Sequence, residues 1–228
     1  MEQLSFAELL IQAPYADKIN AIASDEYAQA ASYAYNRLLT YKAAAAKQLE
    51  RMQEAKAVSA RYIVANEPRA ADGWLAMKNF VEGYRDAAAS LIYETHFYFI
   101  AWHNCSEMLE TLTKDPAFRE ARKAYTKNAK MWHHYKAARH SFEHFADRLP
   151  GGSEHERKMV EVTPPGGSPL KIFFGFVGDN YEHSDQVWDI GQASLDNLYG
   201  AIDAVLSALY PIVDKLVAEK FPRGAKEL

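Results

Sequence analysis

The sequence predicts an all-α protein: an antiparallel four-helix bundle with a small β-hairpin insertion before its last helix. Two observations lead to this prediction. Apolar residues recur at spacings of three and four over four long stretches, which is the period of an amphipathic helix. Between the third and fourth stretches, short β-branched and aromatic runs flank a loop rich in proline and glycine, which is typical of a hairpin.

Capping and breaking residues place the helices. Ser24 is expected to cap the first long helix, Asp115-Pro116 to start the third, and Pro211 to kink or break the last. Apolar residues of the second helix, from Trp74 to Leu109, are expected on or near one face of that helix. Most tyrosines and tryptophans of the chain fall at helical spacing and are interpreted as core or dimer-interface residues. The predicted ranges are a lead-in helix at about 4–12 and long helices at about 24–64, 72–113, 115–149 and 191–220.

The hairpin insertion is expected at about 158–188, with Met159–Val162 and Leu170–Val177 as its strands. The segment between these strands contains Thr-Pro-Pro-Gly-Gly-Ser-Pro, so the loop is longer than a two-residue turn. All residues, 1–228, are interpreted as one domain.

Composition limits the function classes. The 228 residues carry 26 basic and 30 acidic side chains, a formal charge of -4, which argues against a wholly basic nucleic-acid coat. The single cysteine, Cys105, excludes an internal disulfide framework and fits a reducing compartment. The first residues lack a signal-peptide pattern, and no window of 18 uncharged apolar residues occurs, so we expect a cytoplasmic protein without a membrane span.

The densest group of titratable side chains is the segment Arg139–Arg148, late in the third predicted helix. At about 100° per residue, Trp132, Tyr135 and Phe142 fall on the stripe expected to face the core. Arg139 lies at the border, four residues before Glu143, and an ion pair between them is expected. The face opposite the core carries His133, His140, His144 and Asp147.

Positive charge is concentrated on the helix that leads into this segment. Between Pro116 and Phe142 the only acid is Glu120. Such a run attracts phosphate polymers, although it is also the pattern of an ordinary solvated helix face. The candidate RNA-binding residues are Arg119, Arg122, Lys123, Lys127, Lys130 and Lys136.

The string Arg139-His-Ser-Phe-Glu-His144 resembles the Arg-x4-6-His motif of the HEPN superfamily. The resemblance implies an all-α homodimer that cuts RNA without a metal or other cofactor, or that only binds it, often in a toxin–antitoxin setting with an antitoxin-like partner protein. His144 would exchange the proton of an RNA 2′-hydroxyl and Arg139 would hold the scissile phosphate. His140, Glu143, Asp147 and Arg148 would support them.

Two other functions remain open. The first is a non-catalytic helical bundle that binds a partner protein or a nucleotide, in which Arg139 and Glu143 form a structural ion pair. The second is a zinc hydrolase, because His140-x-x-Glu143-His144 matches a zinc-binding helix pattern, with Glu182 or Glu219 as candidate third ligands. The histidines of the second helix, His96 and His103, are interpreted as packed or interface residues and not as ligands. Cys105 is interpreted as a buried structural thiol.

Overall fold

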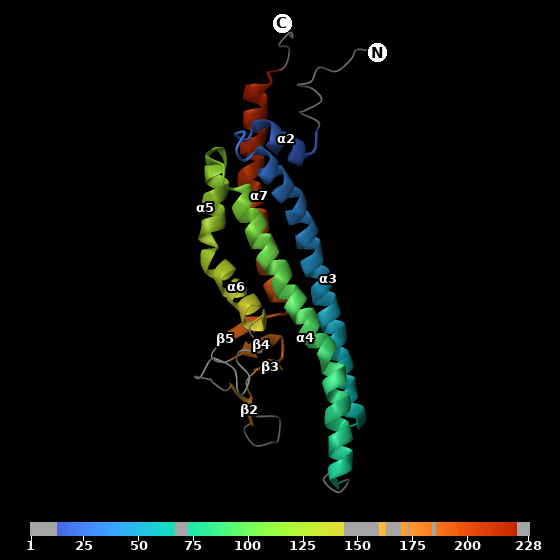
Figure 1. Cartoon of the computed structure of the whole chain (residues 1–228). Helices are drawn as coiled ribbons and strands as arrows, with labels where there is room; N and C mark the ends of the chain where they lie inside the picture. Colours follow the sequence, from blue (N-terminus) through green and yellow to red (C-terminus); the bar gives the residue numbers. More distant parts are fainter. Residues whose placement is uncertain are drawn as a thin grey trace, which may run out of the picture. The chain divides into compact units, whose positions relative to one another are not determined.

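The computed structural model describes residues 13–66, 73–143, 160–162, 170–172, 174–183 and 186–222. Most of these residues are helical, and short antiparallel strands come before the last helix, as the sequence predicts (Figure 1). The elements are α2 (Tyr15–Ile22), α3 (Ala28–Asn66), α4 (Gly73–Leu112), the 3₁₀ turn η2 (Pro116–Phe118), α5 (Arg119–Lys127), α6 (Ala129–Glu143), β1 (Val160–Val162), β2 (Leu170–Ile172), β3 (Phe174–Val177), β4 (Asn180–His183), β5 (Gln186–Asp189) and α7 (Gln192–Lys220).

The second and last long helices of the prediction correspond to α4 and α7, and both begin and end within two residues of the predicted bounds. The helix α7 runs through Pro211 without a break, contrary to one of the two outcomes expected there. The expected start at Asp115-Pro116 is confirmed. Asp115 accepts a hydrogen bond from the backbone N–H of Ala117 at 2.7 Å, and Pro116 occupies the first position of η2.

The third predicted helix is not continuous, so the prediction of one unbroken helix there is wrong. It is divided into α5 and α6 at Asn128, whose backbone N–H bonds to Tyr125 at 3.1 Å in a tighter turn than an α-helix makes. The Asn128 side chain also donates to the carbonyl of Ala124 at 3.2 Å. An asparagine side chain competes for backbone hydrogen bonds in this way, and it ends α5.

The N-terminal elements also differ from the prediction. The lead-in helix expected at about 4–12 lies outside the described residues, and α2 was not predicted. Ser24 does not cap α3 as expected. Its hydroxyl and its backbone N–H both donate to the carboxylate of Asp115, at 2.9 and 2.7 Å, and α3 begins at Ala28. Asp115 therefore ties the start of α3 to the start of η2.

The chain divides into two compact units, each built from segments that are distant in sequence. Unit 1 comprises residues 1–43, 102–133 and 197–228, and unit 2 comprises 44–101 and 134–196. In unit 1 the ring centroids of Trp102 and Trp132 lie 5.9 Å apart, and both indoles are buried. Lys18 reaches Asp214 at 3.2 Å, and this pair ties α2 to α7. The interpretation of residues 1–228 as one domain stays a prediction.

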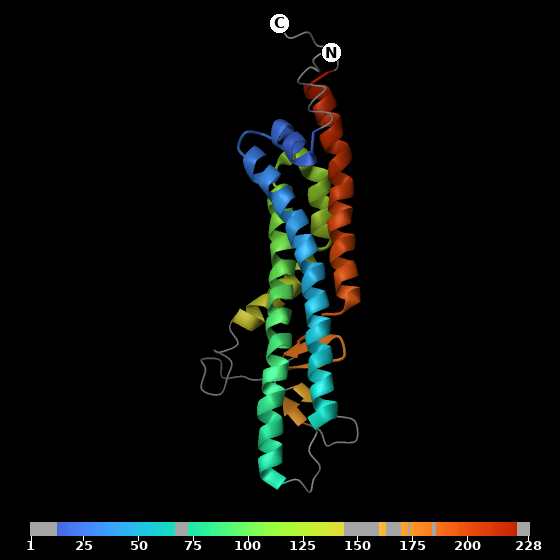
Figure 2. The same ribbon diagram turned by 90° about the vertical axis from the view of Figure 1, so that its right-hand side faces the viewer.

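In unit 2 the second half of α3 lies beside the first half of α4 (Figure 2). The Ser59 hydroxyl donates to the carbonyl of Ala87 at 2.9 Å. The rings of Tyr62 and Phe80 stack with centroids 5.9 Å apart. An added Cβ at Gly83 would overlap the Tyr62 ring, so glycine at this position permits the close approach of the two helices.

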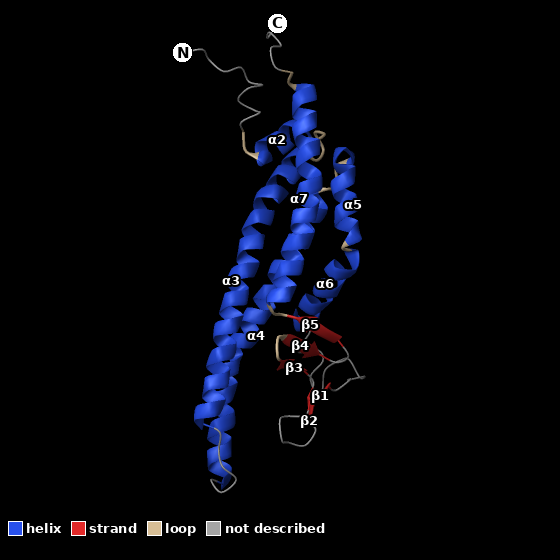
Figure 3. Ribbon diagram, turned by 180° about the vertical axis from the view of Figure 1, so that it is seen from behind, coloured by secondary structure: helices blue, strands red, loops and turns tan. Residues whose placement is uncertain are grey.

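The strands of unit 2 form two small antiparallel sheets, β1-β2 and β3-β4-β5 (Figure 3). The predicted hairpin is confirmed by the pairing of Val160 with Ile172 and of Val162 with Leu170. The run predicted as one strand, Leu170–Val177, is divided between β2 and β3. The strands β4 and β5 were not predicted. Gly178, with φ of 59°, sits in the two-residue turn that joins β3 to β4, and such a turn favours glycine.

The described part of the chain contains no helix of sufficient length and apolar character to cross a membrane.

Candidate functional site

The last turns of α6 hold the described part of the Arg139–Arg148 segment, and both the sheet and α4 support them. Tyr135 is buried, and its hydroxyl donates to the carbonyl of Asp189 on β5 at 2.7 Å. The indole N–H of Trp188 donates to the carbonyl of His134 at 2.8 Å. The predicted core orientation of Trp132 and Tyr135 is confirmed by exposures of 4% and 6%.

A cluster of aromatic rings fixes the end of α6. The Phe142 ring packs on Tyr181 of β4 with centroids 4.7 Å apart, and on Phe99 of α4 at 5.6 Å. Tyr181 and Trp188 stack at 5.7 Å, and both are almost fully buried. These contacts show why the sequence before the last helix matters for the site: the sheet provides the surface on which α6 lies.

Ser141 connects the motif directly to the sheet. Its hydroxyl lies 2.7 Å from Nδ1 of His183 on β4, and both residues are buried. A serine beside a histidine can serve as a nucleophile in an open site. Here both side chains are enclosed, with exposures of 3% and 1%, so the hydrogen bond is a structural link between α6 and β4.

The expected ion pair between Arg139 and Glu143 is confirmed. Nε and Nη2 of Arg139 both lie 2.8 Å from Oε1 of Glu143. Their side chains are 32% and 37% exposed, so solvent reaches both groups. The ion pair therefore orients the guanidinium, while about a third of the Arg139 side chain stays exposed to solvent.

His96, which was predicted to be a packed or interface residue, lies in the same environment. Its ring meets Phe142 edge to face at 5.5 Å. Burial lowers the pKa of its imidazole below the usual 6.5; Glu143 raises this pKa in part, and Arg139 lowers it. The charges of Glu143 and Arg139 thus act on the pKa of His96, and the tertiary structure places this imidazole of α4 against Phe142 of α6.

Two aromatic side chains next to His96 on α4 are open to solvent. Tyr93 is 64% exposed and Phe97 is 52% exposed. The Phe97 ring lies 6.1 Å from the ring of His96. Spacing alone gave these residues no particular role, because helical periodicity does not show which faces other elements cover.

His144, Asp147 and Arg148, together with Phe145 and Leu149, lie outside the described residues. The assignment of His144 as the proton-transfer residue therefore stays a prediction. His140 lies on an exposed face of α6, as expected, and so does His133.

The predicted RNA-binding residues belong to different units. Lys136 is exposed on the part of α6 that belongs to unit 2. The other five belong to unit 1, where Arg119, Lys127 and Lys130 are exposed. Lys123 forms an ion pair with Glu120 at 2.7 Å.

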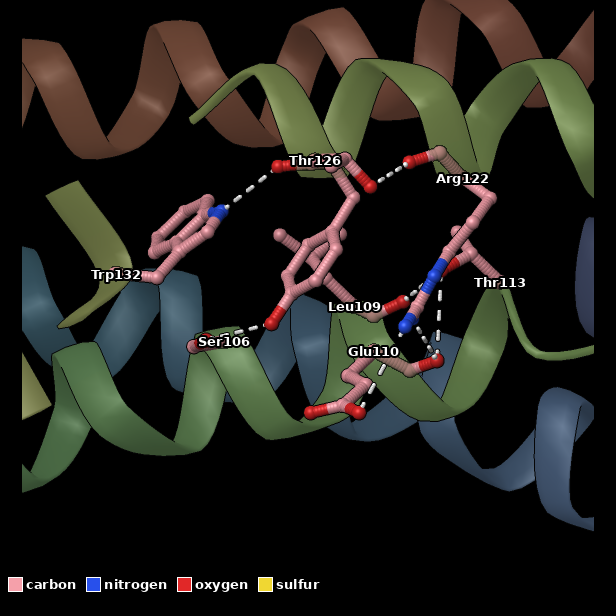
Figure 4. A network of polar contacts seen from close by, with 8 residues as sticks. Ser106, Leu109, Glu110, Thr113, Arg122, Thr126 and Trp132 are labelled. Carbon is pink, nitrogen blue, oxygen red and sulfur yellow. Dashed lines mark hydrogen bonds and ion pairs between the residues drawn. The ribbon is translucent and has the colours of Figure 1, made fainter. Parts of the chain in front are cut away.

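Arg122 has a structural position within unit 1 (Figure 4). It lies 3.8 Å from the Glu110 carboxylate, donates to the Glu110 carbonyl at 3.3 Å, and covers the Tyr125 ring at 5.1 Å. The Tyr125 hydroxyl bonds to Ser106 at 3.2 Å. These contacts fasten α5 to α4, and the expected role of Arg122 in RNA binding stays a prediction.

The zinc pattern stays a prediction, because its second histidine, His144, lies outside the described residues. Within the described ranges, no group of three or more His, Cys, Asp or Glu side chains is placed to hold a metal ion. Cys105 is fully buried, as predicted, and burial raises the pKa of its thiol to about 12. A thiol of this kind is unreactive near neutral pH.

Comparison of the chain with protein-family models, with curated proteins and with solved structures finds no match.

Proposed function

We propose that this protein is a HEPN-like, metal-independent endoribonuclease that acts as a dimer and binds RNA at the end of α6. We also propose that the long helices form an antiparallel four-helix bundle. The observation that best supports the proposed nuclease is the position of Arg139. Its guanidinium forms an ion pair with Glu143, its side chain is one-third exposed, and its charge contributes to the pKa of the His96 imidazole.

Each group has a chemical role in this proposal. Arg139 binds the oxygens of the scissile phosphate, and Glu143 orients the guanidinium until the phosphate arrives. A histidine removes the proton of the 2′-hydroxyl, and the 2′-oxygen then attacks phosphorus. The bond to the 5′-oxygen breaks, and this oxygen takes up the proton that the imidazolium returns. The products are a 2′,3′-cyclic phosphate and a 5′-hydroxyl, so neither water nor a metal ion is consumed.

His144 is the proposed proton-transfer residue, and His96 is the second imidazole of the site. A histidine with a lowered pKa is largely neutral at pH 7, and the neutral form is the one that accepts a proton. The roles of His140, Asp147 and Arg148 as supporting residues remain part of the proposal.

The exposed rings favour single-stranded over double-stranded RNA. Unpaired bases can stack on aromatic side chains, whereas the bases of a duplex are already stacked on each other. Phe97 and Tyr93 offer two such surfaces on α4 near His96. Lys136 and the exposed cations Arg119, Lys127 and Lys130 would add attraction that depends on salt.

The test is incubation of the purified protein with mixed single-stranded RNA in EDTA, beside His144→Ala and Arg139→Ala. We expect cleavage by the unaltered protein and a loss of at least about 100-fold in each variant. His133→Ala is the matched control, because this histidine lies on an exposed part of the same helix outside the proposed site. Equal RNA cleavage by the unaltered protein and by His144→Ala, or no cleavage by either, would refute the proposed nuclease activity.

The ion pair itself favours one rival, a non-catalytic binding protein. If the ion pair between Arg139 and Glu143 is structural, the site binds a partner protein or a nucleotide and breaks no phosphodiester bond. Fluorescence anisotropy with a labelled oligonucleotide, measured beside the cleavage assay, distinguishes a nuclease from a non-catalytic binding protein. Binding that needs Arg139, without cleavage under any condition, would favour the rival.

A further inference from the structure

The described part of the chain leaves an apolar stripe on the first half of α4 exposed. Trp74, Met77, Val81 and Tyr84 follow at spacings of three, four and three, which places them on one face of the helix. Their exposures are 79%, 44%, 55% and 38%. We name these four residues the α4 stripe.

The helix that accompanies α4 in unit 2 packs against a different face. Phe80 stacks on Tyr62 of α3, Gly83 meets the same ring, and the carbonyl of Ala87 accepts the Ser59 hydroxyl. On a helix with about 100° per residue, these contacts are centred roughly 100° from the α4 stripe. The α4 stripe is therefore a second apolar face of the helix, which α3 does not cover.

The size of the stripe suits association. Its four side chains expose roughly 500 Å² of mainly apolar surface, near the upper end of what a monomer usually shows. Pairing two copies would remove on the order of 1,000 Å² from water, which is the lower end for a specific interface. A dimer of modest affinity, sensitive to concentration, is expected from such an area.

The stripe is complementary to itself. When two copies of α4 lie antiparallel about a two-fold axis near residue 79, Trp74 of one copy faces Tyr84 of the other, and Met77 faces Val81. An isologous contact requires this kind of pairing, in which one patch serves both subunits. The large rings then meet each other at the two ends, and the smaller side chains meet in the middle.

Charges beside the stripe agree with the same arrangement. Lys78 and Glu82 share one flank of α4, 3.9 Å apart, and both side chains are 54% exposed. In the antiparallel arrangement, Lys78 of each copy lies close to Glu82 of the other copy. Two opposite-charge contacts would thus cross the seam and fix its register.

We propose that the α4 stripe is a homodimer surface, on which a second copy of this chain docks antiparallel. The proposal names the surface for the dimer of the proposed function. It can be tested without RNA, so it stands or fails separately from the nuclease.

The test is molecular mass by sedimentation over protein concentrations from about 1 to 200 μM, the range in which an interface of this area is expected to form. We expect the unaltered protein to approach twice its chain mass. Val81→Glu should remain monomeric, because it places a carboxylate in the middle of the seam. Val64→Glu is the matched control, since Val64 is 85% exposed on α3 and lies off the stripe; this variant should dimerise normally.

Charge reversal tests the register. Lys78→Glu alone and Glu82→Lys alone should each weaken the dimer, and the double variant should restore it. Circular dichroism should show unchanged helicity in all variants, because every altered side chain is exposed. A monomer at 200 μM, or a dimer that Val81→Glu leaves intact, would overturn the proposal.

Discussion

Ser141 of α6 and His183 of β4 share a hydrogen bond of 2.7 Å inside unit 2, and this bond joins the motif to the sheet. The residues are 42 positions apart in sequence. Together with the Phe142–Tyr181 contact, the bond determines how α6 presents Arg139. Four expectations follow from relationships of this kind, each with its own measurement.

Ser141→Ala should lower the free energy of unfolding by about 1–3 kcal/mol, because the imidazole of His183 loses the hydroxyl that bonds to Nδ1 in a buried setting. Urea denaturation measures the change. Ser90→Ala, at an exposed position of α4, is the control and should shift stability by less than about 0.5 kcal/mol. Equal effects of the two variants would mean that the buried bond contributes little.

Gly83→Ala and Gly200→Ala should act in opposite directions. A Cβ at Gly83 would meet the Tyr62 ring, which must then leave its stack on Phe80, at a cost of about 1 kcal/mol. Gly200 lies in α7 with open space around its Cβ position, so alanine there should stabilise by about 0.5–1 kcal/mol. Thermal unfolding of both variants checks the signs. A neutral Gly83→Ala would show that α3 and α4 tolerate a wider separation.

Arg122→Met should destabilise the protein by about 1 kcal/mol, because the guanidinium contacts Glu110, Thr113 and the Tyr125 ring together. Arg119→Met removes the same charge from an exposed position of α5 and should leave stability nearly unchanged. RNA binding should show the opposite pattern: Arg119→Met should reduce the salt dependence of RNA affinity more than Arg122→Met does. Weaker RNA binding by a stable Arg122→Met protein would contradict the structural assignment of Arg122.

The pH dependence of stability should carry a contribution from His96. Burial holds the folded-state pKa of His96 below the unfolded value of about 6.5. Between these two pKa values the unfolded state binds more protons than the folded state does. This contribution is present above pH 6.5 and is lost as the pH falls below it. Titration of the His96 ring protons by NMR should give a pKa below 6.5. Phe142→Leu, which uncovers the ring, should return it toward that value, and a titration at or above 6.5 in the unaltered protein would contradict the assignment.

The sequence located features whose causes are local. Helical periodicity found α4 and α7, the Asp115-Pro116 pair marked the start of η2, and the four-residue spacing predicted the Arg139–Glu143 ion pair. The division at Asn128 was missed, although asparagine is a common residue at helix ends. The strands β4 and β5 were also missed, although Gly178-Asp179 is a two-residue turn signal.

By itself, the sequence determined which residues share a helix face, because that depends only on the fixed geometry of the backbone. Only the tertiary structure decided which faces are covered, since a distant segment has to arrive to cover them. It placed His96 within the influence of Arg139, enclosed Ser141 against His183, and left Trp74 and Phe97 in solvent. Each of these outcomes depends on contacts between segments far apart in the chain, whose formation helical spacing does not encode.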